Sequence, residues 1–440
     1  MGTLTCRAAL TLLLTAVLVS CGGGGDGGGS SGGFGGLSSG QSPSSPTVAN
    51  KAETEKDDPP PAERLSTGSS DSLGGVSALR AQGTDVVSAL AQRAASEGPL
   101  PFTIVDSSAY GMPRTLAYDA VRGDVYASYP TRGSVGISAI ARFHRGDAGW
   151  ASSTLSIPGL LDIALATDAS VLAATDTSGK VHLIDPVTFR VKSSHTSPDG
   201  IADQGGNTEV GIAFTNDGKL WMPTGSDYPW HGLGFFDLRT STFGKSTTVC
   251  SNCYYGPYLA VASDGSRLMV APSASMSPAP EMFYMDTTDG VFRQNPIGLT
   301  FFYSQTSLSN NGNRFLMTGH QVYDKAFGSV GTVPFLPQDA TMATQLSADG
   351  RRLYALSYGI SSGASAAPLV RVFDASVEAG TQLTLPLVGS FTLPASPSCR
   401  IDQTGCYNPR MRISPDGKNL LILGNEKLLI ATIPKAMRGF

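Results

Sequence analysis

Hydrophobic and polar positions alternate in short runs along this chain, and tight polar turns separate the runs. One clear copy reads Ile-Ser-Pro-Asp-Gly at 413–417, where an apolar run ends and a second run, 420–423, follows. Gly after Asp or Asn adopts the positive φ that a hairpin turn needs. Each copy therefore predicts a β-hairpin. The turns lie near Gly123, Asp168, Asp217, Asp264, Asn311, Asp349 and Asp416.

These turns recur about every 40–50 residues, the period at which propeller blades repeat. The last interval is longer and holds an insertion with two cysteines. In the second unit the strands are predicted at 161–166, 171–175, 180–185 and 190–195. Four short strands per unit and one unit per turn predict an all-β, seven-bladed β-propeller.

The last unit offers only three strands, at 412–413, 420–423 and 428–433. The fourth is predicted to come from residues 102–105, which precede the first turn. Closing the ring in this way removes two open sheet edges. The propeller is assigned to residues 98–440.

Two phrases carry a family resemblance. Val-His-Leu-Ile-Asp-Pro-Val-Thr-Phe-Arg-Val at 181–191 resembles the Val-Ile-Asp-x-x-Thr-x-x-Val phrase of YVTN-type repeats. Gly-Met-Pro-Arg-Thr-Leu-Ala at 111–117 resembles their Gly-x-x-Pro opening. The resemblance implies a YVTN/WD40-like propeller of the quinoprotein amine dehydrogenase-like kind over residues 99–433. Gly-His and Trp-Asp pairs and a literal Tyr-Val-Thr-Asn are missing, and such propellers host unrelated activities.

The N-terminal residues 1–20 have one positive charge, Arg7, and an apolar run, 8–19, that is too short to span a bilayer. Leu-Val-Ser-Cys at 18–21 resembles the bacterial lipobox. The resemblance implies cleavage before Cys21, acylation of Cys21, and, because Gly22 follows, passage to the outer membrane. The alternative is an ordinary signal peptide with an incidental cysteine.

Residues 21–75 are rich in Gly, Ser and Pro, which predicts a disordered tether with a reach of about 40 Å. Residues 76–97 are predicted to form a short helix that packs on the outside of the propeller. Its apolar positions are Val76, Leu79, Val86, Val87, Leu90 and Ala94.

In a four-stranded blade, the turns between strands A and B and between C and D lie on one face. The Asp-Gly turns belong there and are short. The long loops are all predicted on the opposite face: 129–136, 225–232, 272–280 and 357–368 between B and C, and 198–209, 250–258 and 394–409 between D and A. Loops on a rigid scaffold commonly bind partners, although tolerated insertions are the alternative.

Two groups of candidate binding residues follow from this placement. Trp230, His231, Tyr255 and Tyr258 on the loop face suit contact with a protein or glycan, or else they cap the blades as core. Arg114, Asp162, Glu209 and Arg410 begin innermost strands around the channel mouth. The two arginines would suit an anionic ligand, or the four charges pair among themselves.

The remaining cysteines form two close pairs. In an oxidising envelope, Cys399–Cys406 and Cys250–Cys253 are predicted to be disulfides. A shared zinc site would need four sulfurs at one ion, but the two pairs precede blades on opposite sides of the ring. A redox role for Cys250 and Cys253 would need a thioredoxin-like βαβ context, which is missing.

The net charge and the missing motifs limit the functions that this chain is expected to have. The formal net charge is −4 and no basic run occurs, so nucleic-acid binding is not expected. No zincin, Walker or dinucleotide motif appears, so no catalytic residue, metal or cofactor is predicted. We expect a non-catalytic, lipid-anchored envelope protein that presents its loop face to a protein or cell-wall partner. The alternative is a propeller enzyme of lactonase or quinoprotein dehydrogenase type, acting at the channel mouth.

Overall fold

The computed structural model describes residues 102–131, 137–147, 149–202, 211–225, 230–249, 253–254, 258–271, 282–295, 306–317, 320–334, 339–359, 368–395, 397 and 409–439. The predicted signal peptide, tether and short helix lie outside these residues and stay predictions. Among the described residues, no helix combines the length and the apolar character that crossing a bilayer would require.

The described chain forms seven antiparallel sheets, each with four strands in radial order, and the sheet of blade 3 has a fifth strand. Blade 1 has β2 (Leu116–Asp119), β3 (Asp124–Tyr129), β4 (Ala139–Gly146) and β5 (Gly149–Ser156); blade 2 has β6 (Leu160–Leu165), β7 (Leu172–Asp176), β8 (Lys180–Asp185) and β9 (Arg190–Thr196); blade 3 has β10 (Ala213–Phe214), β11 (Lys219–Thr224), β12 (Trp230–Asp237) and β13 (Thr242–Lys245), with β14 (Cys253–Tyr254) added to β12.

The remaining blades follow the same plan. Blade 4 has β15 (Tyr258–Val261), β16 (Arg267–Ala271), β17 (Phe283–Asp286) and β18 (Phe292–Gln294); blade 5 has β19 (Ser307–Leu308), β20 (Arg314–Met317), β21 (Gln321–Asp324) and β22 (Ser329–Thr332); blade 6 has β23 (Asp339–Leu346), β24 (Arg352–Gly359), β25 (Leu369–Asp374) and β26 (Leu387–Thr392); blade 7 has β27 (Arg410–Ile413), β28 (Asn419–Leu423), β29 (Lys427–Thr432) and β1 (Phe102–Asp106).

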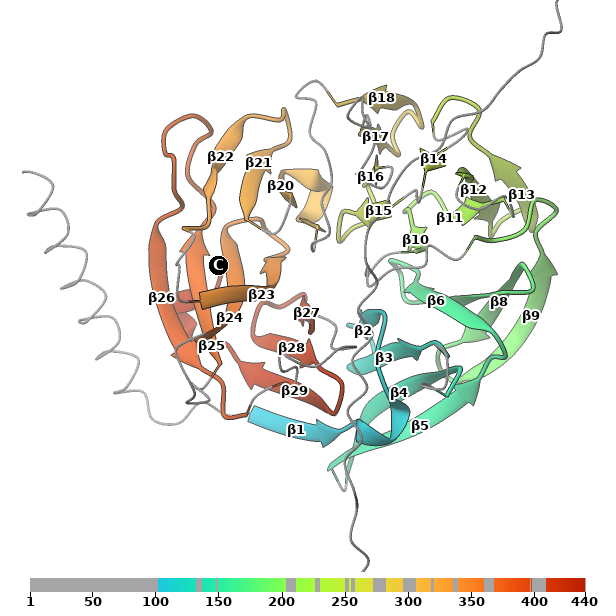
Figure 1. The fold of residues 1–440 in the computed structure, drawn as a ribbon, viewed down its shortest axis with the longest axis horizontal. Helices are drawn as coiled ribbons and strands as arrows, with labels where there is room; N and C mark the ends of the chain where they lie inside the picture. Colours follow the sequence, from blue (N-terminus) through green and yellow to red (C-terminus); the bar gives the residue numbers. More distant parts are fainter. Residues whose placement is uncertain are drawn as a thin grey trace, which may run out of the picture. The chain divides into compact units, whose positions relative to one another are not determined.

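The seven sheets stand radially around a central axis (Figure 1). The innermost strand of each blade contacts that of the next, and β27 contacts β2, so the ring is closed. Within the described ranges, three short 3₁₀ helices, η1 (Ser108–Tyr110), η2 (Asn310–Gly312) and η3 (Lys435–Met437), interrupt the all-β pattern. The predicted seven-bladed propeller is confirmed.

Strand β1 closes the ring as the sequence predicts. It runs antiparallel to β29, with Phe102 opposite Ala431 and Val105 opposite Leu428. Val105 is buried in the core that blades 7 and 1 share. We call the face with the A–B and C–D turns the tight-turn face and the other the loop face. Since β29 ends at the tight-turn face, the chain enters β1 from that face.

Side-chain chemistry fixes the A–B turns. In blade 7 the Ser414 hydroxyl donates to Oδ1 of Asp416 (2.6 Å) and accepts the N–H of Asn419 (2.9 Å). Gly417 has a φ of 64°, which explains the glycine after the aspartate. In blade 6 the Ser347 hydroxyl donates in the same way to Asp349. The recurring Ser-x-Asp-Gly sequence therefore supplies the hydrogen bonds that hold its own hairpin turn.

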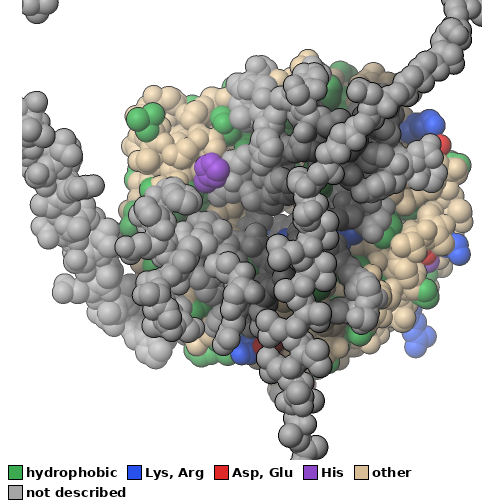
Figure 2. All heavy atoms as spheres, in the orientation of Figure 1, with side chains coloured by type: hydrophobic (Ala, Val, Ile, Leu, Met, Phe, Trp, Pro, Cys, Tyr) green, Lys and Arg blue, Asp and Glu red, His purple; other side chains and the backbone are tan. Residues whose placement is uncertain are grey.

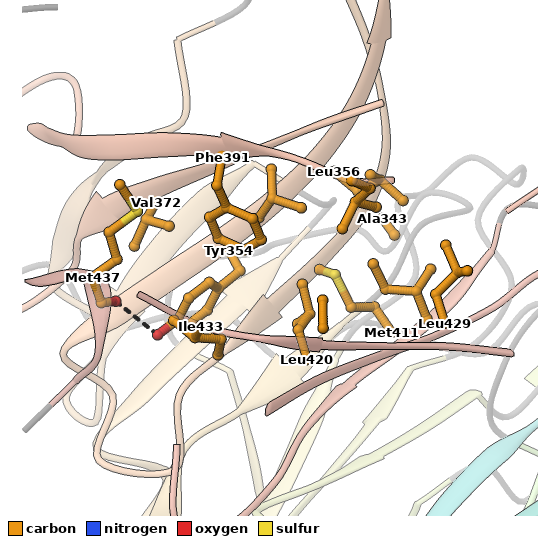
Figure 3. Close-up of a cluster of buried hydrophobic side chains, with 14 residues drawn as sticks. Ala343, Tyr354, Leu356, Val372, Phe391, Met411, Leu420, Leu429, Ile433 and Met437 are labelled. Carbon is orange, nitrogen blue, oxygen red and sulfur yellow. Dashed lines mark hydrogen bonds between the residues drawn. The ribbon is translucent and has the colours of Figure 1, made fainter. Parts of the chain in front are cut away.

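Adjacent blades share hydrophobic cores because both faces of each sheet are apolar. Figure 3 shows the core between blades 6 and 7, where Tyr354, Met411 and Leu420 are buried. The Tyr354 hydroxyl donates to the carbonyl oxygen of Met437 (2.9 Å). This bond joins η3 to blade 6, so the C-terminal segment is part of the packed ring.

One loop prediction is wrong. The C–D connection of blade 6, residues 375–386, is long although it belongs to the tight-turn face. The N–H of Thr332 donates to the carbonyl of Leu383 (3.1 Å), and the N–H of Leu385 donates back to Thr332 (2.8 Å). Thr332 ends β22, the outer strand of blade 5. The extra length covers an open sheet edge, which explains its presence.

Candidate functional site

The loop face brings two separately predicted loops together next to blade 3. Strands β12 and β14 are antiparallel, with Trp230 opposite Tyr254 and His231 opposite Cys253. Strand β12 follows the B–C connection of blade 3, whereas β14 lies in the D–A connection that leads to blade 4. We call this two-residue ladder the β12–β14 pair. It places aromatic positions of two loops at adjacent sites on the backbone.

The other predicted loop-face residues lie nearby in the chain. Tyr258 begins β15, opposite Ala271, and is half-buried. Tyr255 lies outside the described residues. Sequence reasoning missed β14 because two residues are too few for a periodic signal. The only indication of this pairing in the sequence was an aromatic residue in each of the two segments, Trp230 and Tyr254.

Cys253 lies in β14, opposite His231. Its predicted disulfide partner, Cys250, and the pair Cys399 and Cys406 lie outside the described residues. Both disulfides therefore stay predictions.

At the channel, the structure pairs Arg114 with Asp162. Nε of Arg114 lies 3.9 Å from Oδ2 of Asp162, and the Arg114 guanidinium also donates to the carbonyl of Leu161 (3.1 Å). The arginine is 4% exposed and the aspartate 1% exposed. The two charges come from neighbouring blades, 1 and 2. This contact matches the ion-pairing interpretation of the channel charges.

Asp162 is the centre of a polar network that joins three blades. Its carboxylate accepts the hydroxyl of Thr115, the N–H of Ile163 (2.8 Å) and the N–H of Gly211 (2.7 Å), the last from the chain that enters blade 3. A Cβ at position 211 would lie 2.8 Å from Oδ2 of Asp162, so the approach requires glycine. Burial raises the pKa of Asp162, while Arg114 and the hydrogen bonds act in the opposite direction.

A second polar chain joins the blades on the other side of the ring. Arg412 of blade 7 donates to Oε1 of Gln345 in blade 6 (3.4 Å), and the Gln345 amide donates to Ser307 of blade 5 (2.7 Å). Arg410, two residues before Arg412, is 3% exposed. Glu209 lies outside the described residues. Of the predicted channel charges, Arg114 and Asp162 thus form an inter-blade contact.

Blade 2 contains a Ser–His–Asp line that sequence reasoning missed. Nδ1 of His182 lies 2.8 Å from Oγ of Ser194, and Nε2 lies 2.9 Å from Oδ2 of Asp176. Such a line resembles a catalytic relay. However, Ser194 lies within strand β9 rather than on a nucleophile elbow. The other oxygen of Asp176 accepts the N–H groups of Ser178 and Lys180 and holds the B–C turn.

The electrostatics of Asp176 fit this structural role. Burial acts to raise its pKa, but the donors Lys180, His182 and Ser178 outweigh it, so the pKa lies below its ordinary value. In the β8–β9 ladder His182 lies opposite Ser194 because of a register shift between Leu183 and Ile184. We assign the line to tying β7, β8 and β9 together.

The described residues contain no cluster of three or more potential metal-ligating side chains. Figure 2 shows the described hydrophobic side chains in small separate groups, with Lys and Arg gathered at the rim beside β9 and β13. The described residues on the face drawn in Figure 2 therefore form no large apolar patch.

No protein-family model and no curated protein matches the sequence. Among solved structures, the β-propeller domain of Cps50 (Swd1) from Myceliophteria thermophila is 8% identical with a TM-score of 0.49, and the match covers 76% of this chain and 99% of that one. The structure of U3-55K is 10% identical with a TM-score of 0.47, and the match covers 76% of this chain and 98% of that one.

Proposed function

We propose that this protein is a non-catalytic binding scaffold that is anchored to a bacterial envelope membrane through lipidated Cys21. The proposal places it at the outer membrane, with the loop face toward a protein partner. The β12–β14 pair carries the argument, because it aligns Trp230 and Tyr254 across two loops that are anchored on neighbouring blades. Aromatic residues at such sites commonly dominate binding to proteins.

The path of the chain supports this orientation. The segment that precedes Phe102 enters the propeller at the tight-turn face. A membrane anchor at the N-terminus is therefore attached at the tight-turn face, opposite the loop face. The A–B turns on the anchored face are short Asp-Gly hairpins, whereas the predicted binding residues belong to the other face.

Anchoring is tested by replacing the acceptor cysteine. Cys21→Ser is expected to abolish incorporation of labelled palmitate and to move the protein from the membrane fraction to the soluble envelope fraction. Unchanged labelling in the variant would disprove lipidation at this residue.

Binding is tested by photo-crosslinking in intact cells, with the crosslinker at Ser251 beside β14. The expected result is one discrete adduct that Trp230→Ala with Tyr254→Ala removes. Val187→Ser, on the tight-turn face, is the matched control and should leave the adduct unchanged. Adducts to peptidoglycan instead of protein would favour a cell-wall partner, and an adduct that survives the double variant would refute this site.

A further inference from the structure

A groove runs along the seam between blades 7 and 1. Its larger part has a volume of about 570 Å³ and its smaller part about 410 Å³, and both parts are lined by Thr103, Arg145 and Trp150. One wall is β1, which among the described strands pairs only with β29. The other wall is the β4–β5 hairpin of blade 1. The outer edge of the closing strand thus borders the hollow.

The groove combines apolar and basic groups. Tyr118, Trp150 and Ile430 are half-buried and pack against the core that blades 7 and 1 share. Arg122 and Arg145 lie at the tight-turn end, and Arg122 already pairs with Asp119 (2.7 Å). Arg145 is exposed. An occupant of this groove should therefore have an apolar face and an acidic group near its tight-turn end.

The chain itself supplies such a segment immediately before β1. In residues 84–97, Val86, Val87, Leu90 and Ala94 fall on one face of a helix, and Glu97 is the last residue before Gly98 and Pro99. Glycine followed by proline is a common helix end. A helix of this length is about 20 Å long and a five-residue strand about 17 Å. The segment and strand β1, which forms one wall of the groove, therefore match in length.

We propose that residues 84–97 dock as a helix in the seam groove, with the apolar face on Trp150 and Tyr118 and with Glu97 near Arg145. Phe102 lines the groove, so a linker of only a few residues joins the segment to its site. A short linker gives an effective concentration in the millimolar range, which favours this occupant over a second copy of the chain. The docked helix covers the edge of β1 and locks the strand that closes the ring.

Hydrogen–deuterium exchange on the full chain tests the docking. Residues 84–97 are expected to exchange at least about 100-fold more slowly than an unstructured chain, independently of protein concentration. Leu90→Asp should raise exchange of the segment to the unstructured rate without unfolding the propeller, because Leu90 lies outside the ring. Ser88→Asp is the matched control on the opposite helix face and should keep the protection.

A charge exchange tests the orientation separately. Arg145→Glu and Glu97→Arg should each lower the protection about tenfold, and the double variant should restore it. Exchange of 84–97 at the unstructured rate in the unaltered chain would overturn the proposal. Protection that appears only at high concentration would also overturn it and would assign the groove to a second copy.

Discussion

The buried pair of Arg114 and Asp162 gives the most discriminating test of how the ring is held. Asp162→Asn keeps the shape of the side chain but removes the carboxylate charge that Nε of Arg114 contacts at 3.9 Å. The Gly211 N–H, which in the unaltered protein donates to the Asp162 carboxylate at 2.7 Å, would face the N–H₂ or the carbonyl of the asparagine amide. Breaking a buried ion pair by removing one partner costs about 3–5 kcal/mol. We expect a loss of that size in the free energy of unfolding.

The reverse substitution should cost less, because the two partners differ in how they can lose charge. In Arg114→Met the carboxylate keeps its bonds to Thr115, Ile163 and Gly211 and can also bind a proton. An arginine cannot be neutralised in this way. We expect a loss of about 2 kcal/mol at pH 7.5, since one charged hydrogen-bonding partner contributes about 1.5–3 kcal/mol.

The pH dependence of Arg114→Met has a definite sign. Burial raises the pKa of Asp162 above its unfolded value, and loss of Arg114 raises that pKa further. A raised folded-state pKa contributes stability that is full at low pH and is lost as the pH rises through it. The cost of Arg114→Met should therefore be smaller at pH 5 than at pH 7.5.

Guanidinium unfolding followed by circular dichroism measures the cycle of Arg114→Met, Asp162→Asn and the double variant. The expected coupling is about 2 kcal/mol, because the double variant removes both charges of the pair. Thr115→Val, which removes only one hydroxyl from the network, is the control and should cost about 1.5 kcal/mol. Additivity within about 0.5 kcal/mol would refute the pairing. A larger cost of Arg114→Met at pH 5 than at pH 7.5 would refute the pKa argument.

Three further predictions concern other parts of the ring. The hydrogen bond from Arg267 lowers the pKa of Asp286, so the carboxylate stabilises the fold above about pH 4 and this stabilisation is lost as the pH falls through the folded pKa. Asp286→Asn should therefore lower stability at pH 7 and flatten the acid limb of a pH–stability curve. An unchanged acid limb would contradict this. Tyr354→Phe should lower stability by about 1 kcal/mol in denaturant titration by removing the bond to Met437, and no loss would exclude that role. Val105→Asp should lower stability by at least about 3 kcal/mol and release β1 to proteolysis, because it buries an unpaired charge, and a protease-resistant variant would argue against closure by β1.

The hairpins and the closing strand could be predicted from sequence because both depend on local chemistry or on strand counting. The Asp416-Gly417 turn is built by groups within a few residues of each other. The last unit has only three strands of its own, so residues 102–105 could be assigned as its fourth strand, and they pair there. The long connection 375–386 could not be placed in this way. Its hydrogen bonds to β22 join residues about fifty positions apart, and no local pattern encodes them.

The sequence placed Arg114, Asp162, Glu209 and Arg410 around one channel mouth and left two interpretations open: an anionic ligand on the arginines, or pairing among the charges. The structure joins Arg114 to Asp162, with a register shift between Leu160 and Asp162 in the β6–β7 ladder. The sequence shows no sign of that shift. The chemistry of the contact, a buried pair, was predictable, whereas its geometry was not.

The repeat period nevertheless contains the missing pairing rule. Thr115 and Asp162 are 47 positions apart, as are the Arg122 side chain and the Ala169 carbonyl to which it donates, and Asp264 and the Asn311 N–H that it accepts. Each contact joins corresponding positions in neighbouring blades. In a ring of similar units, the inner strands touch at one repeat length, so complementary polar residues one period apart are expected partners. Applied to Thr115, this rule selects Asp162 without any coordinates and extends the use of a repeat from counting blades to predicting how they are joined.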